Sequence, residues 1–310
     1  MTGAESTTLK QGTTLGIKRK RNKTRIVSLS LVFTFIFLLA IRAVYAISIF
    51  NSLAGELRST GWLSTDNDSL MQVREELTYE ANYLVFKIGA VRFQVLSKTT
   101  YDNVPAYRLR AYIDSYSGIP FVNLHAVYET YADAKTFMCL FTSNSEKQGD
   151  SWVYTSYHFD YAKKSVKWEQ SRDGKVVKTI YFPLDHPSTD GISFFYYLRK
   201  ACESEGNKKA DLSIPIVVDT VKSSVDLTVN ENHEPCDVTA FDFPVDSYRM
   251  SGHINFKGFY GITGDFVGWM SSDSAEIPLK GDVKVILGSV VVRLKDIKRD
   301  NWIPPRSSIQ

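Results

Sequence analysis

Cysteine is scarce in this chain of 310 residues, which contains only Cys139, Cys202 and Cys236. At most one intramolecular disulfide can form, and one thiol then remains unpaired. Spacing alone does not fix connectivity, so Cys202 with Cys236 is only a candidate pair for an oxidising compartment. The alternative is three buried free cysteines that act as small hydrophobic side chains.

Sequence motifs of catalysis are also missing. The chain contains no Gly-x-Ser-x-Gly, no His-Glu-x-x-His, no calcium-binding loop and no Gly-rich loop placed before a helix to bind phosphate. The nearest thing to a metal-binding cluster is His233-Glu234-Pro235-Cys236, but a tight site needs two further ligands at a defined spacing. We therefore assign no catalytic residue, no metal ligand and no cofactor to this sequence.

Excess positive charge is absent from most of the chain, although the formal net charge is +3. Residues 1–25 hold seven Lys and Arg residues and one Glu, so the remaining residues carry a net charge of −3. A folded nucleic-acid binder needs basic residues clustered on its folded part, and we therefore exclude nucleic acid as a partner. A hydrophobic content of 44% and an aromatic content of 13% exclude a disordered chain.

A basic cluster stands immediately before a long apolar run near the N-terminus. Residues 26–41 contain no charged side chain, and the run resumes after Arg42 and continues to Phe50. As a helix, residues 26–50 would be about 37 Å long, enough to cross a hydrocarbon core of about 30 Å. The positive-inside rule then makes residues 1–25 a cytoplasmic tail and places the chain after residue 50 outside the cytoplasm. The residues that carry this topology signal are Lys18, Arg19, Lys20, Arg21, Lys23 and Arg25.

Two interpretations of residues 26–50 stay open. We favour an uncleaved single-pass membrane anchor, because no Gly or Pro breaks the run and its apolar character continues past Ala46. The alternative is a signal peptide cleaved after Ala46, which would release the domain into the periplasm. Residues 51–75 are polar and predict a linker in both cases.

Alternation of apolar and polar residues dominates residues 76–298 and predicts a mainly β domain. Asp173-Gly174 between two such runs is the strongest hairpin signal, and residues 192–202 have the spacing of an amphipathic helix. About twelve strands and one short helix predict a single antiparallel barrel-like or roll-like domain, followed by a flexible tail at residues 299–310. We also expect a short helical turn at residues 121–126. The predicted strands span residues 76–98 (a hairpin or one bent strand), 104–115, 127–131, 136–143, 152–161, 164–172, 175–182, 213–219, 221–230, 236–243, 249–259, 264–270, 275–279 and 282–295.

Aromatic residues are concentrated between residues 154 and 197. They are explained either by core packing and cross-strand pairing or by an apolar cavity lined with aromatic rings, as closed β folds sometimes have. The sequence does not separate these two explanations. The aromatic residues concerned are Tyr154, Tyr157, Phe159, Tyr161, Trp168, Tyr181, Phe182, Phe194, Phe195, Tyr196 and Tyr197.

Carboxylates that could form an acid–base pair are few. Glu76 and Glu80 lie on one strand face at a separation of about 13 Å, which suits a solvent-exposed face better than a catalytic pair. Ser193 lies near the predicted helix start, where a serine is normally a cap or first-turn residue and not a nucleophile.

Three segments together resemble the bacterial domain-of-unknown-function family 3108. Residues 76–90 are similar to the opening strand pair of that family, residues 190–199 to its helix and residues 268–290 to its closing segment. Glu75 departs from the pattern by replacing a Gly, and Glu276 by replacing an Arg that usually precedes Ile-Pro. The matching motif positions are Tyr79, Gly89, Asp190, Ser193, Leu198, Arg199, Trp269, Ser272, Asp273, Pro278 and Gly288.

The resemblance implies an exported, β-rich domain of the bacterial envelope, and it implies no activity. Our first hypothesis is a non-enzymatic, membrane-anchored domain that binds an apolar or amphiphilic ligand or an envelope partner protein. The second is a structural or assembly module of the envelope. The third is a hydrolase of envelope polymers that uses scattered carboxylates.

Overall fold

The computed structural model describes residues 70–118, 124–205, 209–256, 263–285 and 288–308. All of them belong to one compact unit, Asp66–Gln310. The predicted cytoplasmic tail, the apolar segment 26–50 and most of the linker lie outside the described residues. Within the described ranges, no helix has both the length and the apolar character needed to span a membrane.

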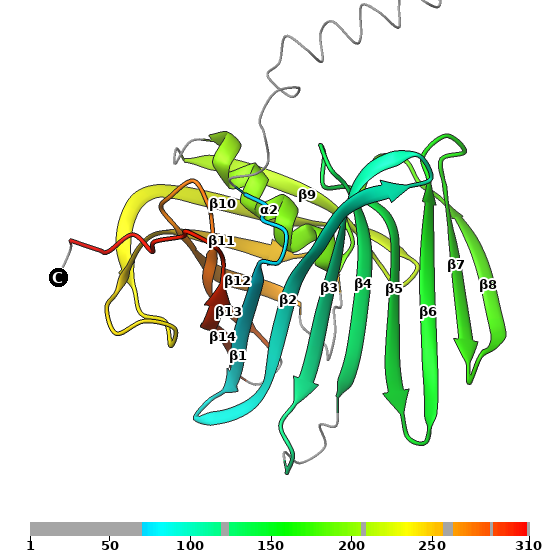
Figure 1. The fold of residues 1–310 in the computed structure, drawn as a ribbon, viewed down its shortest axis with the longest axis horizontal. Coiled ribbons are helices and arrows are strands. Elements are labelled where there is room, and N and C mark those ends of the chain that lie inside the picture. The colour runs from blue at the N-terminus through cyan, green and yellow to red at the C-terminus, as the bar shows by residue number, and fades with distance from the viewer. Residues whose placement is uncertain (1–69, 119–123, 206–208, 257–262, 286–287, 309–310) are drawn as a thin grey trace, which may run out of the picture. The chain divides into compact units, whose positions relative to one another are not determined.

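Fourteen antiparallel strands form one continuous, strongly curved sheet, and one helix, α2 (Gly191–Glu205), crosses its hollow side in the described part of the chain (Figure 1). The predicted mainly β class with a single antiparallel sheet and one helix is therefore confirmed. The strands are β1 (Glu76–Tyr83), β2 (Phe86–Tyr101), β3 (Val104–Ser115), β4 (His125–Asp133), β5 (Cys139–Gln148), β6 (Ser151–Asp160), β7 (Ser165–Arg172), β8 (Lys175–Pro183), β9 (Ala210–Val218), β10 (Val221–Cys236), β11 (Val245–Ile254), β12 (Gly264–Ser271), β13 (Pro278–Lys284) and β14 (Ser289–Lys298).

The order of the strands follows the chain except at one junction. Strands β1 to β8 form one meander and β9 to β14 form another, and the two are joined where β1 pairs with β14. The two free edges, β8 and β9, are therefore consecutive in the chain, and α2 lies between them in sequence. Figure 1 shows the two meanders facing each other across α2.

The segment just before α2 ties the two meanders together. The amide of Cys139 at the start of β5 donates to Ser188 O at 3.0 Å, and the amide of Val217 in β9 donates to Thr189 O at 2.9 Å. Thr189 also forms a parallel bridge with Ile216. The hollow side of the sheet is thus partly closed by residues 188–189.

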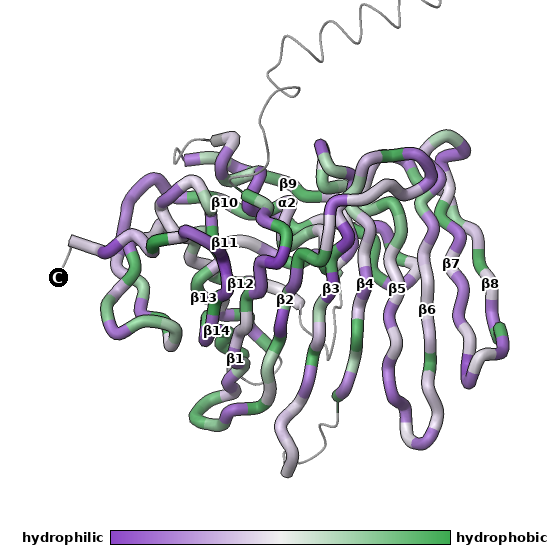
Figure 2. The backbone as a smooth tube through the Cα atoms, viewed as in Figure 1, coloured by the Kyte–Doolittle hydropathy of each residue, from purple (hydrophilic) through white to green (hydrophobic). Residues whose placement is uncertain are grey.

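Local sequence explains two turns. Asp173 and Gly174 both have positive φ, 48° and 79°, as the type I′ turn of a two-residue hairpin requires, and they join β7 to β8 as predicted. Residues 76–98 form a hairpin, but its turn falls at Leu84 and not at Gly89. Gly89 lies in β2, where a Cβ atom would be only 2.4 Å from Asp114 O, so the residue permits a close approach of β3. Figure 2 shows apolar and polar residues alternating along many of the strands.

Two predicted elements near the ends of strands differ from the structure. Residues 237–243 do not extend a strand: β10 ends at Cys236, and the amides of Thr239 and Ala240 donate to Leu294 O in β14 while the segment fills the core as a loop. His125 and Ala126 belong to β4 and not to a helical turn, because they pair with Asp114 and Ile113 of β3. Residues 121–123 lie outside the described residues.

Both ends of the predicted domain are longer than the sequence indicates. Leu70 and Met71, assigned to the linker, are fully buried in a hydrophobic cluster. Residues 299–308, expected to be a flexible tail, are held to the domain: Trp302 Nε1 donates to Asp273 at 2.7 Å, and Arg306 forms a bridge with Val245. The tail is ordered because its hydrogen-bond donors and apolar side chains contact the domain. The two adjacent prolines, Pro304 and Pro305, predict a flexible end and do not indicate these contacts.

Glu80 is buried, against the expected solvent-exposed face. Its carboxylate binds Lys87 Nζ at 2.8 Å, Lys295 Nζ at 3.1 Å and the Tyr116 hydroxyl at 3.0 Å. These contacts, with Lys87 first, lower the pKa of Glu80 to about 2. The long lysine stems cover the carboxylate and keep it ionised.

Helix α2 is fixed to the sheet by a buried ion pair. Arg199 donates to both carboxylate oxygens of Glu75, at 2.6 and 3.2 Å, and its Nε and Nη2 donate to Ala275 O at 3.1 and 2.9 Å. Both side chains are completely buried. Arg299 also binds Glu75. One guanidinium therefore links the helix to the segment before β1 and to the turn before β13.

A second buried carboxyl lies next to this contact. Glu276, which follows Ala275, accepts a hydrogen bond from the buried Tyr248 hydroxyl. Burial raises the pKa of Glu276 to about 8, and the nearby Asp273 carboxylate also raises it. The group is therefore protonated in the folded protein at neutral pH, whereas in an unfolded chain it is ionised.

We expect Arg199→Met to lower the free energy of unfolding by about 3–5 kcal/mol, because the Glu75 carboxylate stays buried with part of its compensation removed. Urea denaturation of the full-length chain measures this. Lys163→Met is the matched control, since it breaks an exposed ion pair with Asp160 and should change stability by about 0–1 kcal/mol. A loss below 1 kcal/mol for Arg199→Met would contradict the anchoring role.

We expect the stability of the chain to fall as the pH rises from about 4.5 to 8, with Glu276 as one cause. Its pKa is higher in the folded state, so the folded state binds one more proton than the unfolded state in this window. Between pH 5 and 8.5 the parent protein should lose on the order of 2–4 kcal/mol of unfolding free energy through Glu276, and Glu276→Gln should remove this loss. Urea denaturation at both pH values measures it, and Glu231→Gln, on an exposed side chain, should leave the slope as in the parent protein. Parallel slopes for Glu276→Gln and the parent would refute the assignment.

Candidate functional site

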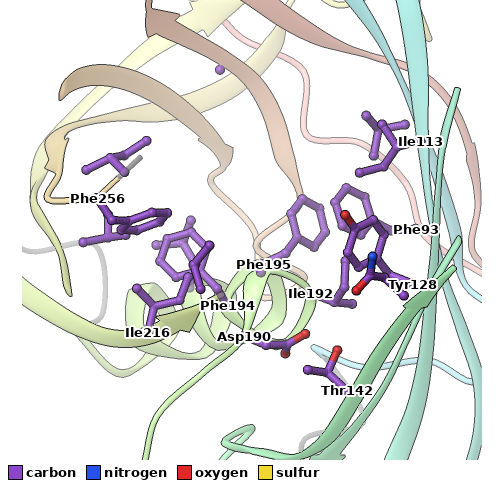
Figure 3. Close-up of a pocket in the computed structure, with 18 of the residues that line it drawn as sticks. Phe93, Ile113, Tyr128, Thr142, Asp190, Ile192, Phe194, Phe195, Ile216 and Phe256 are labelled. Carbon is purple, nitrogen blue, oxygen red and sulfur yellow. The ribbon is translucent and has the colours of Figure 1, made fainter. Parts of the chain in front are cut away.

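A cavity of about 610 Å³ lies on the hollow side of the sheet, against α2 (Figure 3). Its volume falls within the range of pockets that hold one small ligand, about 300–1,000 Å³. Both meanders contribute to its wall, from β1 to β7 on one side and from β9 to β14 on the other. Most of the lining is apolar or aromatic. Its aromatic members are Tyr79, Phe93, Tyr128, Tyr157, Trp168, Phe194, Phe195, Phe256, Phe266 and Trp269.

One wall of the cavity is apolar. It is built by inward-facing residues of β9 to β12 and by one face of α2, which meet in a continuous hydrophobic cluster. Figure 3 shows Ile216 and Phe256 on this side, next to Phe194 of the helix. Gly268 makes room for the side chain of Met250, because a Cβ there would be 3.0 Å from Met250 Cγ. The residues of this wall that line the cavity include Phe194, Leu198, Ile216, Val225, Met250, Ile254, Phe256, Phe266 and Met270.

Three aromatic rings hold the middle of α2 against β1 and β2. Phe195 stacks on Phe93 with ring centroids 4.0 Å apart, and Tyr79 meets both rings edge-on at 5.8 and 6.0 Å. The Tyr79 hydroxyl donates to Pro278 O at 2.7 Å. Burial raises the pKa of Tyr79 well above its usual value, so the hydroxyl stays neutral. These contacts fix the position of α2, whose side chains line part of the cavity.

The opposite wall is polar where β5, β6 and β7 cross it. Thr142, Asn144, Glu146 and Gln148 occupy alternate positions of β5, and all four line the cavity. The register continues this polarity across the strands, because Asn144 pairs with Thr155 of β6 and Thr155 pairs with Gln170 of β7. We call Asn144, Thr155 and Gln170 the polar row. The cavity therefore has two chemically different walls.

Asp190 lies between the walls, and its carboxylate already has protein partners. Oδ1 accepts from the Ser193 amide at 2.9 Å, the Ser193 hydroxyl accepts from the Asp190 amide at 3.0 Å, and Oδ2 accepts from Thr130 Oγ1 at 2.8 Å. The first two bonds form a reciprocal cap at the start of α2. Burial, followed by the effect of Asp190, raises the pKa of the Cys139 thiol well above its usual value. Asp190 is thus the N-cap of α2, and Ser193 is a first-turn residue, one of the two positions that the sequence indicates for this serine.

The motif residues of the closing segment also support the fold. Ser272 Oγ donates to Asp246 at 2.6 Å, and the Trp269 indole donates to Glu234. Asp273 accepts from Ser271 Oγ at 2.6 Å as well as from Trp302. Gly288 has a φ of +90° before β14. Of the eleven motif positions, Tyr79, Asp190, Leu198, Trp269 and Pro278 also line the cavity.

The histidines and cysteines form no reactive cluster in the described part of the chain. His233 binds Asp246 at 2.9 Å, and no group of three His, Cys, Asp or Glu residues among the described ranges is arranged to hold a metal ion. All three cysteines are buried, and none of them forms a disulfide. Cys202, on α2, lies in the hydrophobic cluster that the helix forms with β9 to β12, and Cys236 lies in a different one, so the candidate pair is not joined. Burial raises the pKa of Cys236 to about 12.

The sequence indicated the aromatic part of the cavity lining but not its polar part. Tyr157, Trp168, Phe194 and Phe195 from the aromatic concentration line the cavity, whereas Tyr154 and Tyr181 are exposed. The polar row was missed. The alternation of polar residues along β5 was its signal, but it predicts an ordinary solvated face unless the curvature of the sheet is known.

Two solved structures are similar to this chain. A beta-barrel-like protein of domain of unknown function DUF1849 from Brucella abortus is 9% identical, covers 74% of this chain and 98% of its own, and gives a TM-score of 0.48. A candidate exported protein with a YmcC-like fold from Bacteroides fragilis is 9% identical, covers 74% of this chain and 97% of its own, and gives a TM-score of 0.31. No curated protein matches the chain.

A family model, described as protein of unknown function DUF3108, matches residues 78–295. The match spans more than two thirds of the sequence, and it includes the helix cap, the buried Arg199 and the closing turn described above. The chain belongs to the DUF3108 family.

Proposed function

We propose that this protein is a non-enzymatic binding domain for an apolar or amphiphilic small molecule, displayed outside the cytoplasm. The observation that carries this proposal is the cavity of about 610 Å³ with its largely apolar lining. An apolar space of this size, left open beside a well-packed helix, is a standard setting for ligand binding.

The chemistry of the cavity supports binding over catalysis. Asp190 is the carboxylate most deeply buried in the lining, and both of its oxygens already accept hydrogen bonds from the protein. A general acid or base needs a free position within reach of its substrate. The Cys139 thiol beside it has a raised pKa, which disfavours the nucleophilic thiolate.

The location rests on the sequence of residues 1–50. Six basic residues followed by an apolar run that is long enough to cross a bilayer support an N-terminal anchor, with the binding domain on the far side of the membrane. Cleavage after Ala46 gives the same compartment without the anchor.

An assembly module of the envelope is the second candidate. Strand β8 is a free edge of the sheet and exposes Val176, Val177 and Tyr181, with 57–69% of each residue accessible. Exposed apolar edges are suited to pairing with another chain.

We expect the full-length chain, held in an amphipathic polymer without detergent, to bind the neutral dye Nile red at one saturable site. Ile216→Trp and Val225→Phe each enlarge a side chain that lines the cavity, and each should weaken dye binding at least tenfold. Dye fluorescence titrations measure the affinity, and circular dichroism confirms folding. Val176→Trp adds the same indole on the exposed edge and should leave the affinity unchanged.

Absence of saturable binding, or equal affinity in the folded Ile216→Trp and Val225→Phe variants, would reject the ligand-binding function. The assembly module would then be the better proposal. Crosslinking from β8 in intact cells would be its direct test.

When the protein is expressed in a Gram-negative host, we expect it to be found in the inner-membrane fraction with the mass of the uncleaved chain. Intact mass spectrometry and alkaline extraction distinguish the cases, since an anchor resists extraction and cleavage after Ala46 yields a shorter, extractable protein. Replacing the six basic residues 18–21, 23 and 25 with Gln should weaken or invert the topology. Recovery of the parent chain in the cytoplasm would refute the location.

A further inference from the structure

We propose that the ligand is an amphiphile with an uncharged, hydroxyl- or amide-bearing head group, bound with the head on the polar row and the apolar part on the wall formed by β9 to β12. This inference rests on the proposed binding function and adds the class of ligand and its orientation. Three observations carry it: unpaired polar groups, the sign of the charges in the lining, and the separation of the two walls.

The polar row presents hydrogen-bonding groups that the protein does not use. Asn144, Thr155 and Gln170 are successive partners across β5, β6 and β7, and all three line the cavity. Within the described residues, none of their side chains donates or accepts a hydrogen bond. Thr155 is 6% exposed, and Asn144 and Gln170 are half-buried, so their polar atoms are open to the cavity. A bound head group with hydroxyl or amide groups would supply partners for them.

The charges in the lining disfavour an anionic head at this wall. Glu146, Asp190 and Asp219 all line the cavity, and an added negative charge near them would be repelled in a poorly hydrated space. A cationic head would lie nearest Glu146, which also accepts from Gln148 Nε2 at 3.3 Å, whereas both oxygens of Asp190 already accept hydrogen bonds from the protein. The unused groups are two amides and one hydroxyl, which both donate and accept.

Lys280 provides the alternative pose. It is the only cation among the described residues that line the cavity, and its Nζ lies 4.2 Å from the centroid of the Trp269 ring. An anionic amphiphile would therefore place its head at β13 and its chain in the opposite direction. The two poses require different head groups and different residues, so an experiment separates them.

The apolar wall accepts the other end of the ligand. Figure 3 shows Phe256 and Ile216 on one side of the cavity and Thr142 and Tyr128 on the other, with Ile192 and Phe195 between them. Met250, an adaptable side chain, belongs to the apolar wall. One molecule that spans this distance needs an apolar part and a polar part, which excludes a pure hydrocarbon as the best ligand.

The test compares three probes with alkyl chains of nine or ten carbons: decyl β-glucoside, decanoate and decyltrimethylammonium. Each is titrated, below its micelle concentration, against Nile red bound to the full-length chain in amphipathic polymer. We expect decyl glucoside to compete at least tenfold better than either charged probe. Asn144→Leu and Gln170→Leu should each weaken decyl glucoside about three- to tenfold more than they weaken Nile red, as expected for one lost hydrogen bond. Ser145→Leu, on the opposite face of β5, is the matched control and should change neither affinity.

Three outcomes would overturn the proposal while the binding function stands. Decanoate could bind most tightly and lose affinity in Lys280→Met, which would assign the head group to β13. Decyltrimethylammonium could bind most tightly, which would assign a cationic head to Glu146. All three probes could compete equally in Asn144→Leu, Gln170→Leu and the parent, which would mean that the cavity recognises only the chain. If Nile red itself fails to bind, the proposed function is rejected and not only its refinement.

Discussion

The contact between Arg199 and Glu75 is the constraint on which the rest of the structure depends. A fully buried ion pair is stable only when its remaining hydrogen-bonding positions are filled, and here Ala275 O and Arg299 fill them. The guanidinium therefore fixes α2, the start of β1 and the turn before β13 in one arrangement. The helix is held across the hollow of the sheet, where one face packs against β9 to β12 and Phe195 packs against β1 and β2, and the cavity lies beside it. Both positions that depart from the family pattern, Glu75 and Glu276, are part of this arrangement.

The family motif positions and the cavity lining overlap in part, since five of the eleven motif positions line the cavity and six do not. Asp190, Ser193, Arg199, Ser272 and Asp273 make hydrogen bonds within the protein. The polar row lies outside all three motif segments. The motif segments therefore identify the family without including the polar part of the cavity lining.

Much of the fold follows from the sequence, because alternation and turn residues act locally. The hairpin at Asp173-Gly174 and the helix near residues 192–202 are of this kind. The prediction of a strand at residues 236–243 was wrong. Its alternate apolar residues are buried in a hydrophobic cluster, but the segment beyond Cys236 pairs with no neighbouring strand. The prediction that Glu80 is exposed to solvent was wrong, because the sequence does not show that Lys87 and Lys295 cover its carboxylate. The sequence did not indicate the polar row for a related reason. Which face of a strand points into the cavity depends on the curvature of the whole sheet, and the sequence of a single strand does not show it.

The pairing of β1 with β14 has a consequence for how the domain is made. Glu76 at the start of the sheet faces Lys298 at its end, so the central ladder joins residues that are separated by nearly the whole domain. A chain emerging from a ribosome or a translocation pore exposes one edge of β1 until the final strand follows. Contacts of such long sequence separation also slow folding. The fold therefore gives chaperones and proteases a period in which to act on the incomplete sheet, and a chain truncated before β14 would leave that edge permanently open.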